Sequence, residues 1–103
     1  MPEFSTAFRG LAAARKLSHR ELVRAIQFMI SAEFEAIQLY EQLAESTDNE
    51  PARMTLLDIA REERAHVGEF RTLLRLLAPE DEVDYEEGKS EAQRYLASLA
   101  KTD

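Results

Sequence analysis

The 103-residue sequence has no cysteine, no tryptophan, and only three glycines and three prolines. The lack of cysteine excludes a disulfide framework, thiolate metal sites and thiol nucleophiles. No apolar run approaches the ~20 residues that span a bilayer, and the first residues lack the basic-then-apolar pattern of a signal peptide. The sequence therefore predicts a cytoplasmic protein that does not bind membranes.

Basic residues are also scarce, since 13 Lys and Arg against 20 Asp and Glu give a net charge of −7. This balance argues against nucleic-acid binding and fits an attraction for cations. With neither a glycine-rich phosphate loop nor a nucleophile–histidine pairing, nothing supports acyl, phosphoryl or glycosyl transfer. A chain this short is one domain at most and is near the lower limit for a large core, so we expect it to self-associate.

Two long helical stretches predict a helical hairpin over residues 18–78, and neither glycine nor proline interrupts the first of them. Ser18-x-x-Glu21 is a capping box, so a first helix should begin near His19 and run to about Glu45. Its apolar stripe is interrupted by one carboxylate and reads Leu22, Ile26, Met29, Glu33, Ala36 or Ile37, Tyr40 and Leu43. A carboxylate in a dry core costs several kcal/mol unless it is paired or bound to a cation.

A second helix is expected from about residue 51 to 78, because Pro51 suits a first helical position and Pro79 disfavours helix at the preceding residue. Its stripe carries two residues that can bind metal and reads Leu56, Ile59, Glu63, His66, Phe70, Leu73 and Leu77. The short turn makes the two helices antiparallel neighbours. The numbers of Glu33 and Glu63 average to 48, and those of Glu33 and His66 to 49.5, both inside the turn. All three polar residues should therefore meet at one level.

The other segments are predicted to lie outside the hairpin. Residues 1–17 are interpreted as an N-terminal arm. Residues 79–89, with six acidic residues, are interpreted as a linker. Residues 90–103 should form a short C-terminal helix that Ser90 caps, with an apolar face of Ala92, Tyr95, Leu96 and Leu99.

Glu63-x-x-His66 places both side chains on one helix face, within reach of a single ion. This spacing alone is a weak signal, and the match with Glu33 strengthens it. Di-iron carboxylate bundles use a Glu from each of two helices and a Glu-x-x-His from each of two others, while this chain offers one of each. We therefore expect a homodimer that closes a four-helix bundle around two metals. The ligand set suits Fe, Mn, Mg or Ca, with Zn as a substitute, and iron is the metal we predict.

Nearby polar residues allow more than one interpretation. Tyr40 lies two turns from Glu33, where a core aromatic residue and a residue that orients a ligand are about equally consistent with the sequence. Glu35 and Glu62 point off the stripes, so they are expected to be solvated, with delivery of cations to the site as the alternative. His19 is interpreted as a surface histidine.

Two segments, Ser31-Ala-Glu33-Phe-Glu35-Ala-Ile-Gln-Leu-Tyr40 and Asp58-Ile-Ala-Arg-Glu62-Glu63-Arg-Ala-His66, resemble the signature helices of the encapsulated ferritins, a branch of the ferritin-like superfamily. The resemblance covers about residues 18–78. It implies a ferroxidase centre shared by two chains, dimers arranged in a ring that is typically a decamer, and delivery of oxidised iron to an encapsulin shell. Glu33, Glu63 and His66 match the family's iron ligands, with Glu63 as the bridging carboxylate, and Tyr40 matches its tyrosine near the site.

The chain departs from this pattern at three places. Ala32 replaces an acid of the family's iron-uptake site and leaves Glu35 as the remaining match, and Leu39 stands where members often have tryptophan. The last twelve residues show no clear Gly-Ser-Leu-type cargo peptide, so either the tag is absent from this sequence or the protein works without a shell.

The function we predict is oxidation of Fe(II) by dioxygen, in iron storage or detoxification, with Glu33, Glu63 and His66 as metal ligands and catalytic residues. Two alternatives stay open. A Ca or Zn ion could hold the dimer together without turnover, which would make the protein an assembly module. The polar stripe residues could also serve only to fix helix register in a plain interaction domain.

Overall fold

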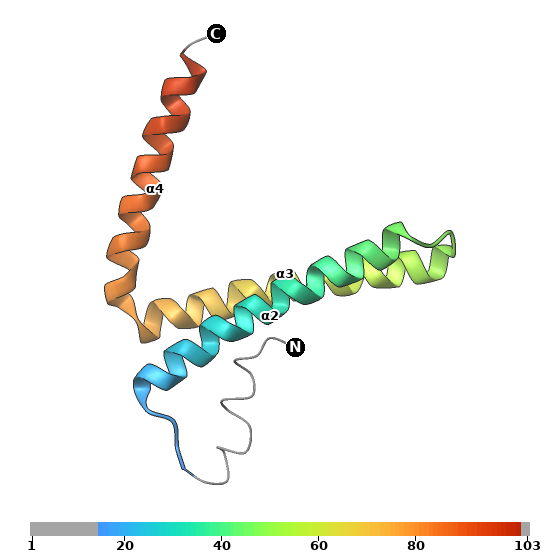
Figure 1. Ribbon diagram of the computed structural model, residues 1–103, viewed down its shortest axis with the longest axis horizontal. Coiled ribbons are helices and arrows are strands. Elements are labelled where there is room, and N and C mark those ends of the chain that lie inside the picture. Colours follow the sequence, from blue (N-terminus) through green and yellow to red (C-terminus); the bar gives the residue numbers. More distant parts are fainter. Residues whose placement is uncertain (1–14, 102–103) are drawn as a thin grey trace.

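The computed structural model describes residues 15–101, which contain three α-helices and no strand (Figure 1). Helix α2 spans His19–Glu45, α3 spans Glu50–Leu77 and α4 spans Pro79–Ala100. α2 and α3 lie side by side as an antiparallel hairpin, and α4 leaves the end of the hairpin steeply. The predicted all-α class and hairpin are confirmed. Most of the predicted N-terminal arm, residues 1–14, lies outside the described residues.

The predicted capping box fixes the start of α2. The Glu21 amide donates to Ser18 Oγ at 3.1 Å, and the Ser18 amide donates to Glu21 Oε1 at 2.9 Å. Arg15 donates to both oxygens of the same carboxylate, at 2.7 and 2.8 Å. This guanidinium, helped by the Ser18 amide, lowers the pKa of Glu21 to about 2.

Local signals also fix the two ends of α3. The Asn49 side chain caps its start by accepting from the Ala52 amide at 3.0 Å, with Pro51 in the first turn. The helix ends at Leu77 because Ala78, which precedes Pro79, takes a non-helical conformation with φ −135° and ψ 62°. Ala78 is therefore the single residue that joins α3 to α4.

The hairpin core is a narrow line of contact between α2 and α3. Its buried residues are Ile37 and Ala44 on α2 and Ala60 and Val67 on α3. On each helix the two buried residues are seven positions apart. This line defines two faces of the hairpin. We call the face that carries Glu33, Glu63 and His66 the site face. We call the opposite face, which carries Glu41 and Arg64, the groove face.

Apart from Ile37, the predicted apolar stripes lie beside this contact line rather than on it. His66 directly precedes the buried Val67, so it is turned by about 100° from the contact. Met29, Leu43 and Leu73, which belong to the same stripes, each expose more than a third of their surface. A band of apolar surface on the site face therefore remains open within one chain.

The predicted linker over residues 79–89 was wrong, because these residues form the first half of α4. Pro79 occupies the first helical position, and Glu80, Asp81 and Glu82 lie in the first turn, where the helix dipole favours negative charge. The helix passes through Gly88 and Ser90 without a break. α4 has no buried residue, and none of the helices within residues 15–101 combines the length and apolar character needed to cross a membrane.

Candidate metal centre

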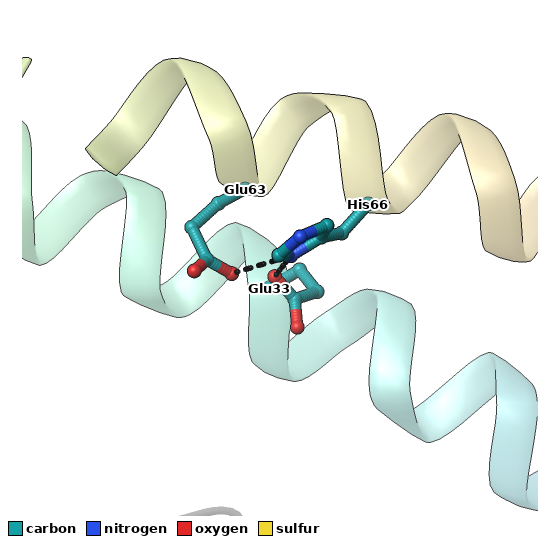
Figure 2. Close-up of side chains that lie close together, drawn as sticks. All are labelled: Glu33, Glu63 and His66. Atoms are coloured by element: carbon teal, nitrogen blue, oxygen red, sulfur yellow. Dashed lines mark ion pairs between the residues drawn. The ribbon is translucent and has the colours of Figure 1, made fainter. Parts of the chain in front are cut away.

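Three side chains from α2 and α3 come together at one level of the hairpin (Figure 2). Glu33 comes from α2, while Glu63 and His66 come from successive turns of α3. His66 Nδ1 lies 3.5 Å from Glu33 Oε2 and 3.6 Å from Glu63 Oε2. One potential ligand atom from each residue lies within 4.8 Å of the others, which is close enough for a single ion to reach all three. Glu33, Glu63 and His66 therefore lie at the same level of the hairpin, as their residue numbers predicted.

The burial of these side chains differs in a way that matters for ligand binding. Glu33 and Glu63 are only 21% and 19% exposed, whereas the His66 side chain is 48% exposed. Glu33 Oε2 is inaccessible to solvent and has no hydrogen-bond partner. A buried carboxylate oxygen without a partner is costly, and a cation would remove this cost. Carboxylate oxygens with one imidazole also form a donor set that suits iron, so the residues fit a metal.

The cluster stands out from the other acidic residues of the chain. Within residues 15–101, Glu33, Glu63 and His66 form the single set of three or more carboxylate and histidine side chains gathered closely enough to hold a metal. Asp58, which is also on α3, is instead paired with Arg61 at 2.9 Å.

The structure separates the three converging residues from the others that the sequence singled out. Tyr40 is half-buried and lies seven residues after Glu33, so it shares the site face of α2 two turns away. Glu35 and Glu62 are exposed, in line with the solvated interpretation. Ala32, at the position of the missing acid, is half-buried.

Two long-range contacts that hold the hairpin were not predicted. His19 Nε2 donates to the Leu77 carbonyl at 2.8 Å and links the start of α2 to the end of α3. On the groove face, Arg64 forms an ion pair with Glu41 across the two helices. Glu33 and Glu41 lie four residues before and after the buried Ile37, so they turn by about 40° to opposite sides of the contact line. Periodicity could have placed Glu41 and Arg64 on one face, whereas no pattern indicates the role of His19.

Comparisons with known proteins agree with this geometry. A family model described as rubrerythrin matches residues 22–102. The crystal structure of the encapsulated ferritin domain from Pyrococcus furiosus is similar to this chain, with a TM-score of 0.74 and 42% sequence identity, and the match covers 78% of this chain and 82% of that one.

Two curated relatives are named for encapsulin. The ferritin-like–encapsulin shell fusion protein of P. furiosus is 47% identical over 73 residues, which is 71% of this chain and 21% of that protein. The encapsulin nanocompartment cargo protein EncC of Myxococcus xanthus is 42% identical over 66 residues, or 64% of this chain and 51% of that one. The chain thus spans between a fifth and about half the length of these relatives.

Proposed function

Since this chain belongs to the rubrerythrin family, a ferritin-like group that typically binds di-iron, we propose that it is a ferroxidase that oxidises Fe(II) to Fe(III) with dioxygen. The observation that carries the proposal is the convergence of Glu33, Glu63 and His66, with one buried carboxylate oxygen left without a partner. Each Fe(II) gives one electron to dioxygen. The anionic carboxylates favour the more highly charged Fe(III), which makes the bound iron easier to oxidise.

The active unit is proposed to be a homodimer. Ferritin-like di-iron bundles require two Glu and two Glu-x-x-His contributions, and one chain supplies half of that set. The half-exposed His66 and the exposed Met29 and Leu73 lie on the open site face, where a second copy would cover them. Two copies related by a two-fold axis would supply two complete sets of Glu33, Glu63 and His66. We expect such dimers to assemble further into a ring, as in the decamers that the sequence resemblance implies.

The residues are proposed to have distinct roles. Glu63 would be the bridging carboxylate, and Glu33 and His66 would be terminal ligands of iron. The Tyr40 hydroxyl, two turns along α2, is proposed to orient a ligand rather than to bind metal. The exposed Glu35 and Glu62 would attract cations to the site, a role made more important by Ala32.

Two relatives are named as an encapsulin fusion and as an encapsulin cargo protein. We therefore propose that this protein works in the cytoplasm inside an encapsulin shell, to which it supplies oxidised iron for storage or detoxification. Co-expression with a shell protein, followed by size exclusion of the assembled particles, tests this partnership. Free protein recovered apart from intact shells would contradict it.

The ferroxidase proposal is tested by Glu63→Ala, with Glu91→Ala on α4 as the control. Fe(II) is added without oxygen, oxygen is then admitted, and ferric absorbance and oxygen consumption are followed. Loss of a ligand should slow oxidation by about 100-fold or more, since even changes to groups that only support ligands cost 10–100-fold. The exposed Glu91 lies outside the hairpin and should be replaceable with little effect. Oxidation by Glu63→Ala at the parent rate, or metal-dependent dimerisation without oxygen consumption, would refute the proposal.

A further inference from the structure

Met29 lies on the site face, one helical turn from the metal centre. It precedes Glu33 by four residues on α2, so the two residues are about 6 Å apart along the axis and turned by about 40° from each other. The numbers of Met29 and Phe70 average to 49.5, as do those of Glu33 and His66. Met29 and the half-buried Phe70 therefore form the next level of the hairpin, an apolar layer directly beside the metal ligands.

Met54 provides a comparison within the same molecule. The sequence has three methionines and no cysteine, and residues 15–101 contain two of these thioethers, Met29 and Met54. Met54 is the more exposed, at 61% against 36% for Met29. It precedes Glu63 by nine residues on α3, which places it about 14 Å along the axis and on the opposite side of the helix. Exposure to solvent thus favours oxidation of Met54, whereas nearness to the metal centre favours oxidation of Met29.

The proposed reaction supplies an oxidant at this place. Two Fe(II) ions in one centre give two electrons to dioxygen, and with two protons the products are two Fe(III) ions and one hydrogen peroxide. The second copy that is proposed to cover the site face would also cover Met29, so peroxide released there meets Met29 before it reaches bulk solvent. The polarisable thioether of methionine is a group that such oxidants commonly attack.

We propose that hydrogen peroxide from the metal centre oxidises Met29 to methionine sulfoxide, and that this modification slows the protein's own turnover. The oxidant comes from the proposed ferroxidase reaction, so oxidation of Met29 depends on that function. The sulfur attacks one peroxide oxygen, an S–O bond forms as the O–O bond breaks, and the other oxygen leaves as water with both protons. Sulfur loses the two electrons that peroxide gains. Because the sulfoxide is polar, it weakens the apolar contact between the two copies that close the centre.

Peptide mass spectrometry of the full chain after turnover tests the proposal. The protein receives repeated additions of Fe(II) followed by oxygen, with catalase present to destroy peroxide that escapes, and oxygen consumption is followed in the same sample. We expect at least about 5-fold more sulfoxide at Met29 than at Met54, because the oxidant forms beside Met29. Met29 should stay reduced in Glu63→Ala. Hydrogen peroxide added to the metal-free parent should reverse the order, since Met54 is the more exposed.

The rate of iron oxidation over successive additions tests the effect on turnover. Met29→Leu keeps the apolar volume, so its rate at the first addition should equal that of the parent. It should hold this rate over later additions, whereas the parent should slow by about 2-fold or more as the sulfoxide accumulates. Methionine sulfoxide reductases should restore the parent's rate. Met54→Leu is the matched control and should slow like the parent.

Three results would overturn the proposal for Met29 while the ferroxidase function stands. These are oxygen consumption without more sulfoxide at Met29 than at Met54, a preference for Met29 under added peroxide as well, and an equal decline in rate in Met29→Leu and the parent. Absence of oxygen consumption by the parent would instead refute the ferroxidase function, and oxidation of Met29 by its product with it.

Discussion

The two faces of the hairpin use carboxylates in opposite ways. On the site face, Glu33 and Glu63 converge with only the half-exposed His66 beside them. On the groove face, Glu41 is neutralised by Arg64 from the neighbouring helix. The arrangement on the site face leaves Glu33 Oε2 buried without a hydrogen-bond partner, which lowers the stability of the fold. The ion pair on the groove face raises the stability slightly. The contrast between a carboxylate paired with arginine on one face and two carboxylates with only a histidine on the other supports the proposal that Glu33 and Glu63 bind a metal.

The largest expected difference between the faces comes from replacing one carboxylate on each with leucine. Without metal, Glu33→Leu should raise the free energy of unfolding by about 1–2 kcal/mol, since it removes a poorly compensated charge from an apolar stripe. Glu41→Leu should lower it, because Arg64 loses its partner. Urea unfolding at fixed protein concentration measures both effects.

The same pair of variants separates the faces when metal is present. Zn(II) should raise the melting temperature of the parent and of Glu41→Leu, because a ligand that binds only the folded state stabilises it. Glu33→Leu should lose most of that increase. A Glu33→Leu protein that is less stable without metal, or equally stabilised by Zn(II), would mean that the two faces do not differ as described.

A smaller effect is expected from the ion pair on the groove face. Arg64→Ala should lower the free energy of unfolding by at most about 1 kcal/mol, because both partners are partly exposed and water screens their attraction. A double-mutant cycle with Glu41→Ala isolates the coupling between them. Oxidation of Fe(II) should be unchanged in both variants. Loss of oxidation would show that the groove face contributes to the site.

The smallest effect concerns a carboxylate outside both faces, Glu21 at the start of α2. Because the folded-state pKa of about 2 lies below the ordinary value of 4.5, its stabilising contribution is present above about pH 4.5 and is lost as the pH falls through about 2. Glu21→Gln should therefore lower stability near neutral pH and lose less stability than the parent on acidification. Urea unfolding of both proteins at several pH values measures the difference, and parallel curves would contradict it.

The hairpin and the proximity of its three polar residues were predictable because both depend on local or arithmetical features. Ser18, Glu21 and Asn49 cap helices through residues three positions away, so their partners are visible in the sequence. In an antiparallel pair, residue numbers alone decide which residues share a level.

The sequence could not predict which surface of each helix packs against its neighbour in the same chain. Apolar periodicity finds stripes, but a stripe of leucine and methionine that awaits a second chain looks the same as one that packs within the chain. The small buried Ala44 and Ala60 mark the real contact line, and they carry no strong hydrophobic signal. The first half of α4 was missed because its acidic composition resembles that of a solvated linker, although acidic residues near a helix start are favourable.

The thirty residues from Glu33 to Glu63 impose a counting rule on any relative that keeps this cluster. Deleting one residue from α2 between Glu33 and the turn would shift Glu33 by about 1.5 Å and rotate it by about 100°, off the site face. Seven added residues restore the face but move Glu33 about 10 Å along the axis, so α3 must gain seven as well. Hairpins that retain the cluster should therefore differ in length by matched heptads, whereas the chain beyond Ala78 is free to vary by single residues.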